Sequence, residues 1–562
     1  MSYRAPVAEM CFLLGEVLGA GRLAETDRFA DATPETIEAV LGEAARIAED
    51  VLAPLRRAGD LEPARLENGV VRTTPGFAEA YRAIADGGWV GIAAAPEHGG
   101  MGLPVTLLTC VGEMFSAANM AIALCPLLTQ GQIEALEHHA PPELRALYLP
   151  KLASGTWTGT MNLTEPQAGS DVGAIRARAE PRPDGTHAVS GQKIFISWGD
   201  HDVAENIVHL VLARLPDAPA GTRGISLFLV PKFIPDAEGR PGERNGVRAL
   251  SLEHKTGLHG SPTCVMEFDA ARGWLIGAPH QGLAAMFTMM NNARLAVGVE
   301  GLSQADAALQ AALAFARERR QGRTPDGTEA IIGHADVRRM LMTMAALTAT
   351  ARAICLDCAL SIDMAAATGE EAWAARAAFL TPIAKAFGTD TGCEVASLAM
   401  QVFGGMGYIE ETGVAQFWRD VRVTAIYEGT NGIQAMDLVG RKLADGGAVG
   451  QKLIEAIEEG VRENPGELGA SLAAAARRLA ETTGWMAAAE PNDRFAGAAP
   501  YLRAFALTLG GHYLLKAAAT EAEAGPRTAL ATFHVRQLLP QVAALCDAAS
   551  AGAAPLYATD FA

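Results

Sequence analysis

The stretch "HAVSGQKIFIS", residues 187–197, decides the fold because it is a clear β pattern in a chain that is otherwise mostly helical in pattern. Its end alternates apolar and polar side chains, as the pleat of a half-buried strand requires. Similar runs follow at 206–215 ("NIVHLVLARL") and 225–233 ("ISLFLVPKF"), separated by turns rich in Gly, Pro, Asp and Asn. Together these runs predict a small antiparallel sheet or barrel over residues 157–277.

Helical patterns lie on both sides of this β region. The residues "TPE" at 33–35 place Thr, Pro and Glu in the order that starts a helix. Beyond residue 280, two segments of about thirty residues carry apolar side chains at spacings of three and four, which is typical of an antiparallel bundle. Strands and helices are therefore segregated, which disfavours a parallel nucleotide-binding sheet.

These patterns predict a mainly α-helical protein with a central β domain. We expect an N-terminal extension over 1–33 and a helical N-terminal domain over 34–156. The β domain over 157–277 is followed by an antiparallel helix bundle over 278–443. A Gly-rich joint, "ADGGAVG", then leads into an appended helical domain that occupies residues 444–562.

Composition narrows the possible functions. The chain has 562 residues and a formal net charge of −18, with no basic block, so a nucleic-acid partner is not expected. The first residues do not resemble a signal peptide, and no run of 18 uninterrupted apolar residues occurs. We therefore expect a cytoplasmic protein without stable membrane insertion.

The eight cysteines form no legible disulfide framework, which fits a reducing compartment. Cys355 and Cys358 make a lone CxxC inside a helical pattern, with no second pair. Buried helix cysteines are favoured there over a metal or redox site, and no metal is expected.

Glu428 is oddly placed in "AIYEGTNGIQ", between Tyr427 and Gly429. The side chain of Ile426 and the ring of Tyr427 would exclude water from the carboxylate and so raise its pKa, as a general base at neutral pH requires. Gly429 would leave room for a flat substrate. A structural carboxylate that caps the following helix is the alternative, and from these residues alone both remain open.

Two Gly-rich segments have the character of cofactor loops. In "TEPQAGSD", Thr164 and Ser170 flank a tight turn whose free amides and hydroxyls suit the polar edge of a flavin. A loop whose side chains cap its own backbone is the alternative. In "QVFGGMGY", Gly404 and Gly405 would let the backbone approach a pyrophosphate closely.

Four stretches in one order resemble the acyl-CoA dehydrogenase family over roughly residues 35 to 440. They are "MNLTEPQAGSDVGAI" (161–175), "GQKIFISWGDHD" (191–202), "QVFGGMGYIEE" (401–411) and "RDVRVTAIYEGTNGIQ" (419–434). The order of helices, β domain and helix bundle is also the layout of such enzymes. The resemblance implies FAD-dependent α,β-dehydrogenation of an acyl-CoA thioester to the trans-2-enoyl-CoA.

The resemblance also assigns roles to residues, with Glu428 as the catalytic base. An arginine, an aromatic residue and two small residues are implied to bind substrate: Arg294, Tyr427, Gly429 and Ser170. FAD is implied to contact residues of the β domain: Met161, Leu163, Thr164, Gly169, Ser170, Phe195 and Ser197. Thr430, close to the base in sequence, is also implied to contact it. A second group is implied to reach the FAD of a neighbouring subunit: Arg319, Gln401, Gly404 and Gly405.

Some positions depart from the family pattern. Phe195 and Ser197 stand where many members have Trp and Thr, a pair that keeps an aromatic face and a hydroxyl. Gly432 replaces a common Gln or Glu. His259 stands where many members have Arg. Two roles remain open for it: a contact with CoA, or that of an ordinary loop histidine with hydrogen bonds to its own protein.

The long tail places the chain nearest a long bacterial branch of the family. That branch includes enzymes for 3-methylmercaptopropionyl-CoA, a β-thioether formed in dimethylsulfoniopropionate breakdown, so this is the expected substrate. A short- or medium-chain fatty acyl-CoA is the alternative. The resemblance further implies an electron-transfer flavoprotein as acceptor and a homodimer.

Two other classes of protein are alternatives to such an enzyme. A DNA-associated flavoprotein on the same fold would need a basic C-terminal region, which the tail lacks. A non-catalytic acyl-CoA-binding protein is disfavoured because Glu428 and the flavin motifs are intact.

Overall fold

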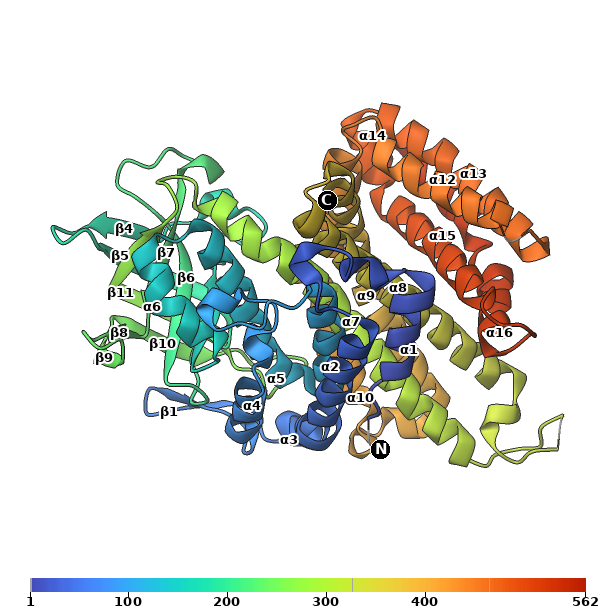
Figure 1. The fold of residues 1–562 in the computed structure, drawn as a ribbon, viewed down its shortest axis with the longest axis horizontal. Coiled ribbons are helices and arrows are strands. Elements are labelled where there is room, and N and C mark those ends of the chain that lie inside the picture. Colours follow the sequence, from blue (N-terminus) through green and yellow to red (C-terminus); the bar gives the residue numbers. More distant parts are fainter. Residues whose placement is uncertain (1–2, 326, 464, 562) are drawn as a thin grey trace.

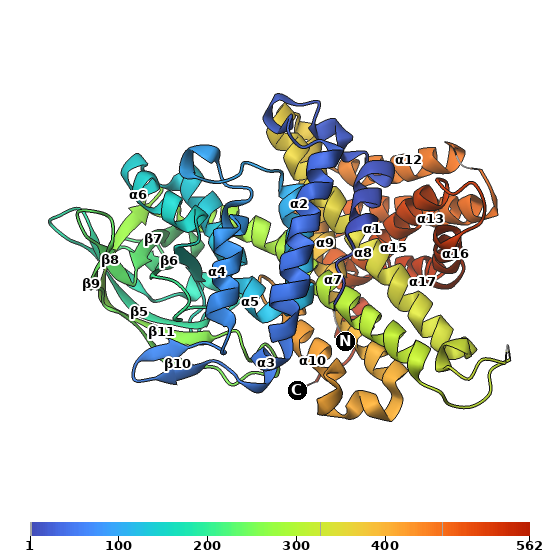
Figure 2. The same cartoon turned by 60° about the horizontal axis from the view of Figure 1, so that its bottom comes forward.

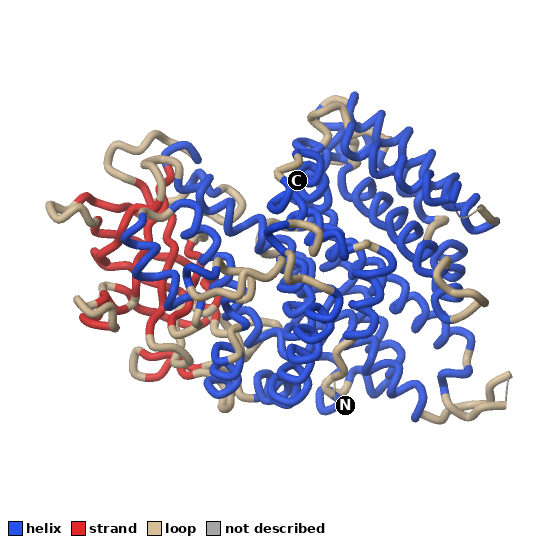
Figure 3. Tube along the Cα trace, in the orientation of Figure 1, coloured by secondary structure: helices blue, strands red, loops and turns tan. Residues whose placement is uncertain are grey.

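The computed structural model describes residues 3–325, 327–463 and 465–561, apart from the side chains of residues 291 and 292. Residues 1, 2 and 562, at the ends of the expected first and last segments, lie outside this range. The strands gather at one end of the molecule and helices make up the rest (Figures 1 and 3). The predicted fold class, mainly helical with a central β domain, is confirmed.

The N-terminal extension packs against the helix bundle. Helix α1 (Val7–Phe12) and the turns that follow bury Met10, Leu14 and Val17 in the same core as the helix bundle. The Lys516 ammonium donates to the carbonyl of Val17, which ties this segment to the C-terminal helices. The remaining helices before the sheet are α2 (Pro34–Ile47), α3 (Arg56–Leu61), α4 (Phe77–Asp86), α5 (Val105–His139) and α6 (Pro142–Ala153).

A two-stranded hairpin interrupts these helices, and the helical patterns did not predict it. Strands β1 (Arg65–Glu67) and β2 (Val70–Arg72) pair antiparallel around Asn68 and Gly69, which have φ of 50° and 77°. Asn-Gly is the strongest short signal for such a turn, because both central residues need positive φ. The dipeptide was therefore the clue in the sequence.

The described part of the β domain contains a seven-stranded sheet in the order β10-β11-β5-β4-β6-β3, in which β7 pairs with both β11 and β6. The prediction of an antiparallel sheet is wrong at two pairs, because β3 and β4 both run parallel to β6. At least one other strand lies between each of them and β6 in the chain, so no hairpin sets their direction. The strands are β3 (Trp157–Asn162), β4 (Arg178–Pro181), β5 (His187–Ser197), β6 (Asn206–Arg214), β7 (Ile225–Pro231), β10 (Val247–Leu252) and β11 (Thr263–Ile276), beside a small hairpin of β8 (Phe233–Pro235) and β9 (Pro241–Arg244).

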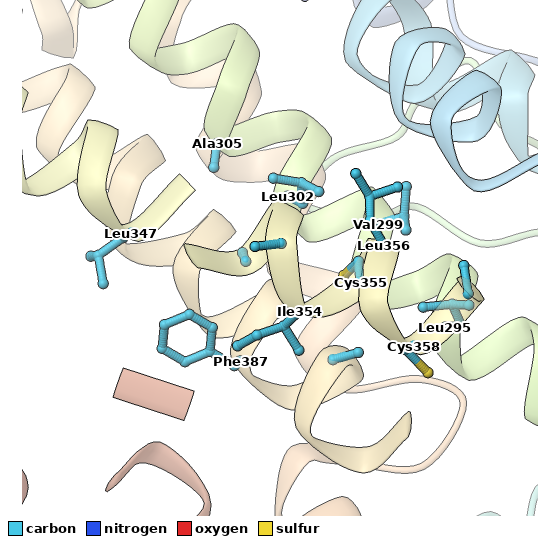
Figure 4. Packing of buried hydrophobic residues seen from close by; sticks show 14 of the residues in the cluster. Leu295, Val299, Leu302, Ala305, Leu347, Ile354, Cys355, Leu356, Cys358 and Phe387 are labelled. Atoms are coloured by element: carbon cyan, nitrogen blue, oxygen red, sulfur yellow. The ribbon is translucent and has the colours of Figure 1, made fainter. Parts of the chain in front are cut away.

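Three long helices form the bundle: α7 (Gly282–Glu318), α8 (Ala335–Thr368) and α9 (Glu371–Phe403). Helices α7 and α9 approach so closely that only glycine fits between them. A Cβ on Gly298 would lie 2.5 Å from the carbonyl oxygen of Ala384, and a Cβ on Gly388 would strike the carbonyl of Gly298. Leucine, valine and isoleucine side chains fill the core beside this contact (Figure 4).

Six helices follow the bundle: α12 (Ala448–Glu463), α13 (Glu467–Ala488), α14 (Pro491–Ala496), α15 (Ala498–Ala518), α16 (Pro526–Phe533) and α17 (Gln541–Ala549). The turned view shows α12, α13, α15, α16 and α17 grouped on the side away from the strands (Figure 2). Helix α15 packs against α8, where the Tyr513 hydroxyl donates to Asp357. Helix α16 begins at Pro526, directly after Gly525.

Within the described residues, helices α5 and α8 are long and apolar enough to cross a membrane by length and composition alone. Most of each apolar stretch, 89 % and 83 %, is buried inside the protein, as in core helices. Cys355 and Cys358 lie in α8 and are buried, and burial raises the pKa of the Cys358 thiol to about 12. Their prediction as buried helix cysteines is confirmed.

Candidate functional site

Glu428 lies in a tight turn between two helical segments. A short 3-10 helix (Arg422–Ala425) precedes it and α11 (Asn431–Asp437) follows it. Glu428 has φ of 54° and Gly429 has φ of 83°, so the chain passes through two successive left-handed residues. A non-glycine residue in this region stores strain, which is common at functional sites.

The helix after this turn is capped by Thr430. Its hydroxyl accepts the backbone N–H of Ile433 at 3.3 Å, which is the usual N-cap bond. The alternative in which Glu428 caps this helix is therefore wrong. The resemblance implies that Thr430 contacts FAD. In the structure its hydroxyl caps the N-terminus of α11.

The surroundings of the Glu428 carboxylate suit a general base. Its Oε2 is buried and has no hydrogen-bond partner among the described residues. Burial raises the pKa of Glu428 to about 7, while the charges of Arg294 and Lys385 lower it. Such a carboxyl exchanges its proton near neutral pH, which is the condition for efficient general base catalysis.

Lys385 supports the turn from α9. Its side chain is fully buried, and its ammonium donates to the carbonyl of Gly429 and to Oδ1 of Asn431, both at 2.9 Å. Burial lowers the pKa of Lys385 to about 8. Sequence analysis missed this residue, although a lone lysine in the apolar run "TPIAKAFG" was a signal.

Helix α7 supports the turn from the opposite side. Arg294 is only 6 % exposed, and its guanidinium lies 4.0 Å from Asp437. The Tyr427 hydroxyl donates to the buried carboxyl of Glu300. Ile426 is 53 % exposed, so its predicted part in excluding water from Glu428 is wrong; Tyr427 alone of the pair points into the protein.

The predicted flavin aromatic, Phe195, sits on a β-bulge. Cys264 pairs with Ile196 and Met266 with Lys193, so two residues of β5 face one residue of β11. Phe195 has φ of 60° and is 60 % exposed, whereas Lys193 is fully buried. Simple alternation, which would put both on one face, fails here because the bulge turns Phe195 outward.

The loop after β3 is organised by a carboxylate that sequence analysis missed. Glu165 is 4 % exposed and accepts the backbone N–H groups of Arg176 (2.7 Å) and Ala177 (3.0 Å) and the Lys193 ammonium (2.8 Å). These bonds tie the start of the loop to the residues that follow it and to β5. Met161, Leu163 and Thr164 are half-buried at the end of β3, and Gly169 and Ser170 are exposed.

Three predicted contact hydroxyls are free. Those of Thr164, Ser170 and Ser197 make no hydrogen bond within the described part of the chain. Together with the exposed ring of Phe195, they offer a flat apolar face and donors that no protein group uses. This set of residues fits a flavin ring with a polar edge.

The other predicted cofactor residues lie at the far end of the bundle. Arg319 follows α7, about 28 Å from Glu300 at roughly 1.5 Å per helical residue. Phe315 and Phe403 stack at 4.1 Å and bring the ends of α7 and α9 together. Here the exposed residues Gln401, Gly404 and Gly405 lie beside Arg319, so this group is not joined to Glu428 in one chain.

His259 belongs to a junction of three domains. Its ring nitrogens lie 3.2 Å from the carbonyl of Asp60 and 3.1 Å from that of Lys255. The Asp60 carboxylate of α3 also accepts two hydrogen bonds from Arg419, which lies in α10 (Val414–Val421). Protein acceptors thus lie within hydrogen-bond distance of both ring nitrogens, and the N–H of either tautomer has a partner, which favours the loop histidine over a CoA contact.

A cavity of about 760 Å³ runs between α5, α7 and α8. Its walls are mainly apolar, with Trp89 and Phe115 on one side and Leu295 and Val299 of α7 on another. Arg294 and Glu300 flank these residues on the same helix. Because the cavity lies beside the helix that supports the Glu428 turn, it offers space for an apolar ligand near the site.

Four family models match consecutive parts of the chain. They describe the acyl-CoA dehydrogenase N-terminal domain (34–156), middle domain (160–271) and C-terminal domain (280–443), and an acetyl-CoA dehydrogenase C-terminal-like domain (451–560). Each match falls on a separate structural region of the molecule.

Known proteins resemble the chain over most of its length. A 3-methylmercaptopropionyl-CoA dehydrogenase of Ruegeria pomeroyi is 46 % identical over 93 % of this chain and 92 % of its own. A butyryl-CoA dehydrogenase of Syntrophomonas wolfei is 35 % identical over 78 % of this chain and 76 % of its own. The solved structure of Caenorhabditis elegans ACDH-11 in complex with C11-CoA has a TM-score of 0.82 at 19 % identity, covering 100 % of this chain and 96 % of that one.

Proposed function

The chain belongs to the acyl-CoA dehydrogenase family and is an oxidoreductase of that kind, and from this premise we propose that Glu428 is the base of the reaction and 3-methylmercaptopropionyl-CoA its substrate. The observation that carries the proposal is the Glu428 turn. It presents a carboxylate whose pKa burial raises to about 7 and whose buried oxygen has no hydrogen-bond partner in the described part of the chain. Hydrogen bonds from α7 and α9 hold the residues on either side of it.

The residues of this chain account for the proton-transfer half of the reaction. Glu428 takes the proton from the carbon α to the thioester, and the product is the trans-2-enoyl-CoA. The backbone N–H of Glu428 donates to no acceptor among the described residues, so it is available to the thioester oxygen, on which negative charge develops. The charges of Arg294 and Lys385 lower the pKa of Glu428 and so favour the ionised carboxylate for the next turnover.

We propose FAD as the cofactor. Phe195, Thr164, Ser170 and Ser197 would hold its ring system, and Arg319, Gln401, Gly404 and Gly405 would hold the ADP half bound to a partner subunit. When bound, the flavin supplies the acceptor for the hydride that leaves the β carbon.

The double variant Phe195→Ala with Ser197→Ala is expected to lose FAD during purification. Phe195 supplies an exposed ring, and the Ser197 hydroxyl makes no hydrogen bond among the described residues, so the two substitutions remove no buried core side chain. The ratio of flavin to protein absorbance measures occupancy, and the melting temperature of the apoprotein measures folding. Full occupancy in a folded double variant would refute this placement of the cofactor.

The choice of substrate rests on the Ruegeria relative, whose identity extends through the C-terminal helices. The expected result of a substrate panel with an artificial electron acceptor is the highest kcat/KM with 3-methylmercaptopropionyl-CoA. Butyryl-CoA and longer acyl-CoA thioesters serve as comparators. A clear preference for butyryl-CoA or a medium-chain thioester would favour the second candidate, to which the Syntrophomonas relative points.

The remaining parts of the proposal concern assembly and context. Met406, Tyr408 and Ile409 are exposed beside the second cofactor group, which supports a homodimer that covers them. Helices α12 to α17 cover another face of the bundle. We propose an electron-transfer flavoprotein as acceptor and a cytoplasmic location, with no nucleic-acid or membrane partner, in keeping with the net charge of −18.

A further inference from the structure

Glu300 is a buried carboxyl that the reaction as described does not use. It lies on α7 and is 1 % exposed. One carboxyl oxygen accepts the Tyr427 hydroxyl, and the other, Oε1, has no hydrogen-bond partner among the described residues. An isolated buried carboxyl is costly, so its retention beside the site calls for a role.

The Tyr427–Glu300 bond anchors the chain one residue before the base. The bond from Lys385 to the Gly429 carbonyl anchors it one residue after. Glu428 is therefore held between two anchors on two different helices, α7 and α9, at a backbone angle of φ 54° that an unrestrained chain avoids.

The spacing of the two anchoring helices is itself rigid. Gly301, next to Glu300, lies against α9, where a Cβ would contact the Thr389 Cα and the Gly388 carbonyl. Gly298 and Gly388 meet in the same way one turn earlier. A rigid distance between α7 and α9 converts the two hydrogen bonds into a defined position for the Glu428 carboxylate.

We propose that Glu300 is a positioning residue for Glu428, acting through the Tyr427 hydroxyl to hold the left-handed turn in the orientation needed for proton abstraction. The inference rests on the proposed role of Glu428 as base. Misplacement of a reacting group by about 1 Å costs roughly 100-fold in rate, so a lost anchor should be visible in the chemical step.

The charge state of Glu300 fits this role. Burial raises its pKa to about 8, the bond from Tyr427 lowers it and the Glu428 charge raises it. The charged groups that face this cluster are Arg294 of α7, Lys385 and Asp390 of α9, and Asp437 of α11. This shift favours the protonated form at neutral pH, in which Glu300 anchors Tyr427 without adding a second negative charge beside the base.

The test compares Glu300→Ala, Glu300→Gln and Tyr427→Phe in the FAD-loaded protein. Glu300→Ala and Tyr427→Phe should each lower the limiting rate of flavin reduction by about ten-fold or more, at unchanged Kd for acyl-CoA, FAD content and melting temperature. Glu300→Gln resembles the protonated acid and keeps an acceptor for Tyr427, so it should recover most of the rate lost in the alanine variant. Combining Glu300→Ala with Tyr427→Phe should cost no more than either alone.

A wild-type rate in both Glu300→Ala and Tyr427→Phe would overturn the inference. So would a loss of rate that only parallels lost FAD or lowered melting temperature, since that is a structural effect. If Glu300→Ala does not fold, Tyr427→Phe decides, because it removes one hydroxyl and leaves the packing intact. Glu455→Ala, on the exposed face of α12, is the control that should match the wild type.

Failure of the proposed function gives a different result. In that case no acyl-CoA reduces the wild-type flavin, and the variants have no rate to compare. An active wild type with unaffected variants would sink only the role of Glu300.

Discussion

Replacing Glu428 with Gln is expected to lower the rate of flavin reduction by acyl-CoA by roughly 10²- to 10⁴-fold, the range typical of losing a general base. The amide has nearly the shape of the carboxylate but cannot take a proton. FAD content and acyl-CoA affinity should be retained, because neither the ring-binding residues nor the two anchors of the turn change. Rapid mixing of the purified, yellow variant with substrate, followed by visible absorbance, measures the rate.

Glu371→Gln is the matched control. Glu371 is an exposed carboxylate at the start of α9 in the same domain, and its variant should reduce flavin like the wild type. Complete bleaching of the Glu428→Gln flavin at the wild-type rate would remove Glu428 from the mechanism.

The same assay has a defined pH dependence in the wild type. A base must be unprotonated to act, and burial raises the pKa of Glu428 to about 7. The rate should therefore fall as the pH falls through about 7 and level off above it. The small residual rate of Glu428→Gln should lack this acid limb.

Replacing Arg352 with Met is expected to destabilise the whole bundle by about 3–5 kcal/mol, the usual cost of breaking a buried ion pair from one side. Arg352 of α8 donates to Glu113 of α5 (2.6 Å and 2.8 Å) and to Asp306 of α7 (2.8 Å). All three side chains are buried. Methionine fills much of the space but leaves two carboxylates without a counter-charge.

Thermal denaturation should show this as a clear drop in the unfolding temperature. Arg46→Met is the control, because Arg46 pairs with Glu43 on the exposed face of α2 and should leave the unfolding temperature unchanged. An Arg352→Met protein that unfolds at the wild-type temperature would show that the buried carboxylates find other partners or take up protons at little cost.

The order of helices, sheet and helices could be predicted because it depends on local patterns. Alternation and turn residues mark the strands, and spacings of three and four mark the helices. The parallel pairing of β3 with β6 could not be predicted, because it depends on where the chain returns after the strands that lie between them. The bulge at Phe195 was equally hidden, since alternation does not say where a strand slips.

The site was only partly predictable for a related reason. Glu428 could be picked out from its neighbours in the chain, but its supports come from afar. Glu300 and Lys385 are more than forty residues away in sequence and meet the turn only after α7 and α9 pack. Each was visible as a single charged residue in an apolar helix, "VGVEGL" and "PIAKAF", a signal that marks a buried polar role without naming its partner.

The two faces of helix α7 have different roles. Gly298 and Gly301 touch α9 and tolerate no added atom, whereas Ala293, Leu295, Ala296 and Val299 line the cavity. Substitutions on the cavity face can therefore change the shape of the cavity while the glycine contacts with α9 stay intact. The space beside the helix and the position of the base are thus set by different residues of the same helix.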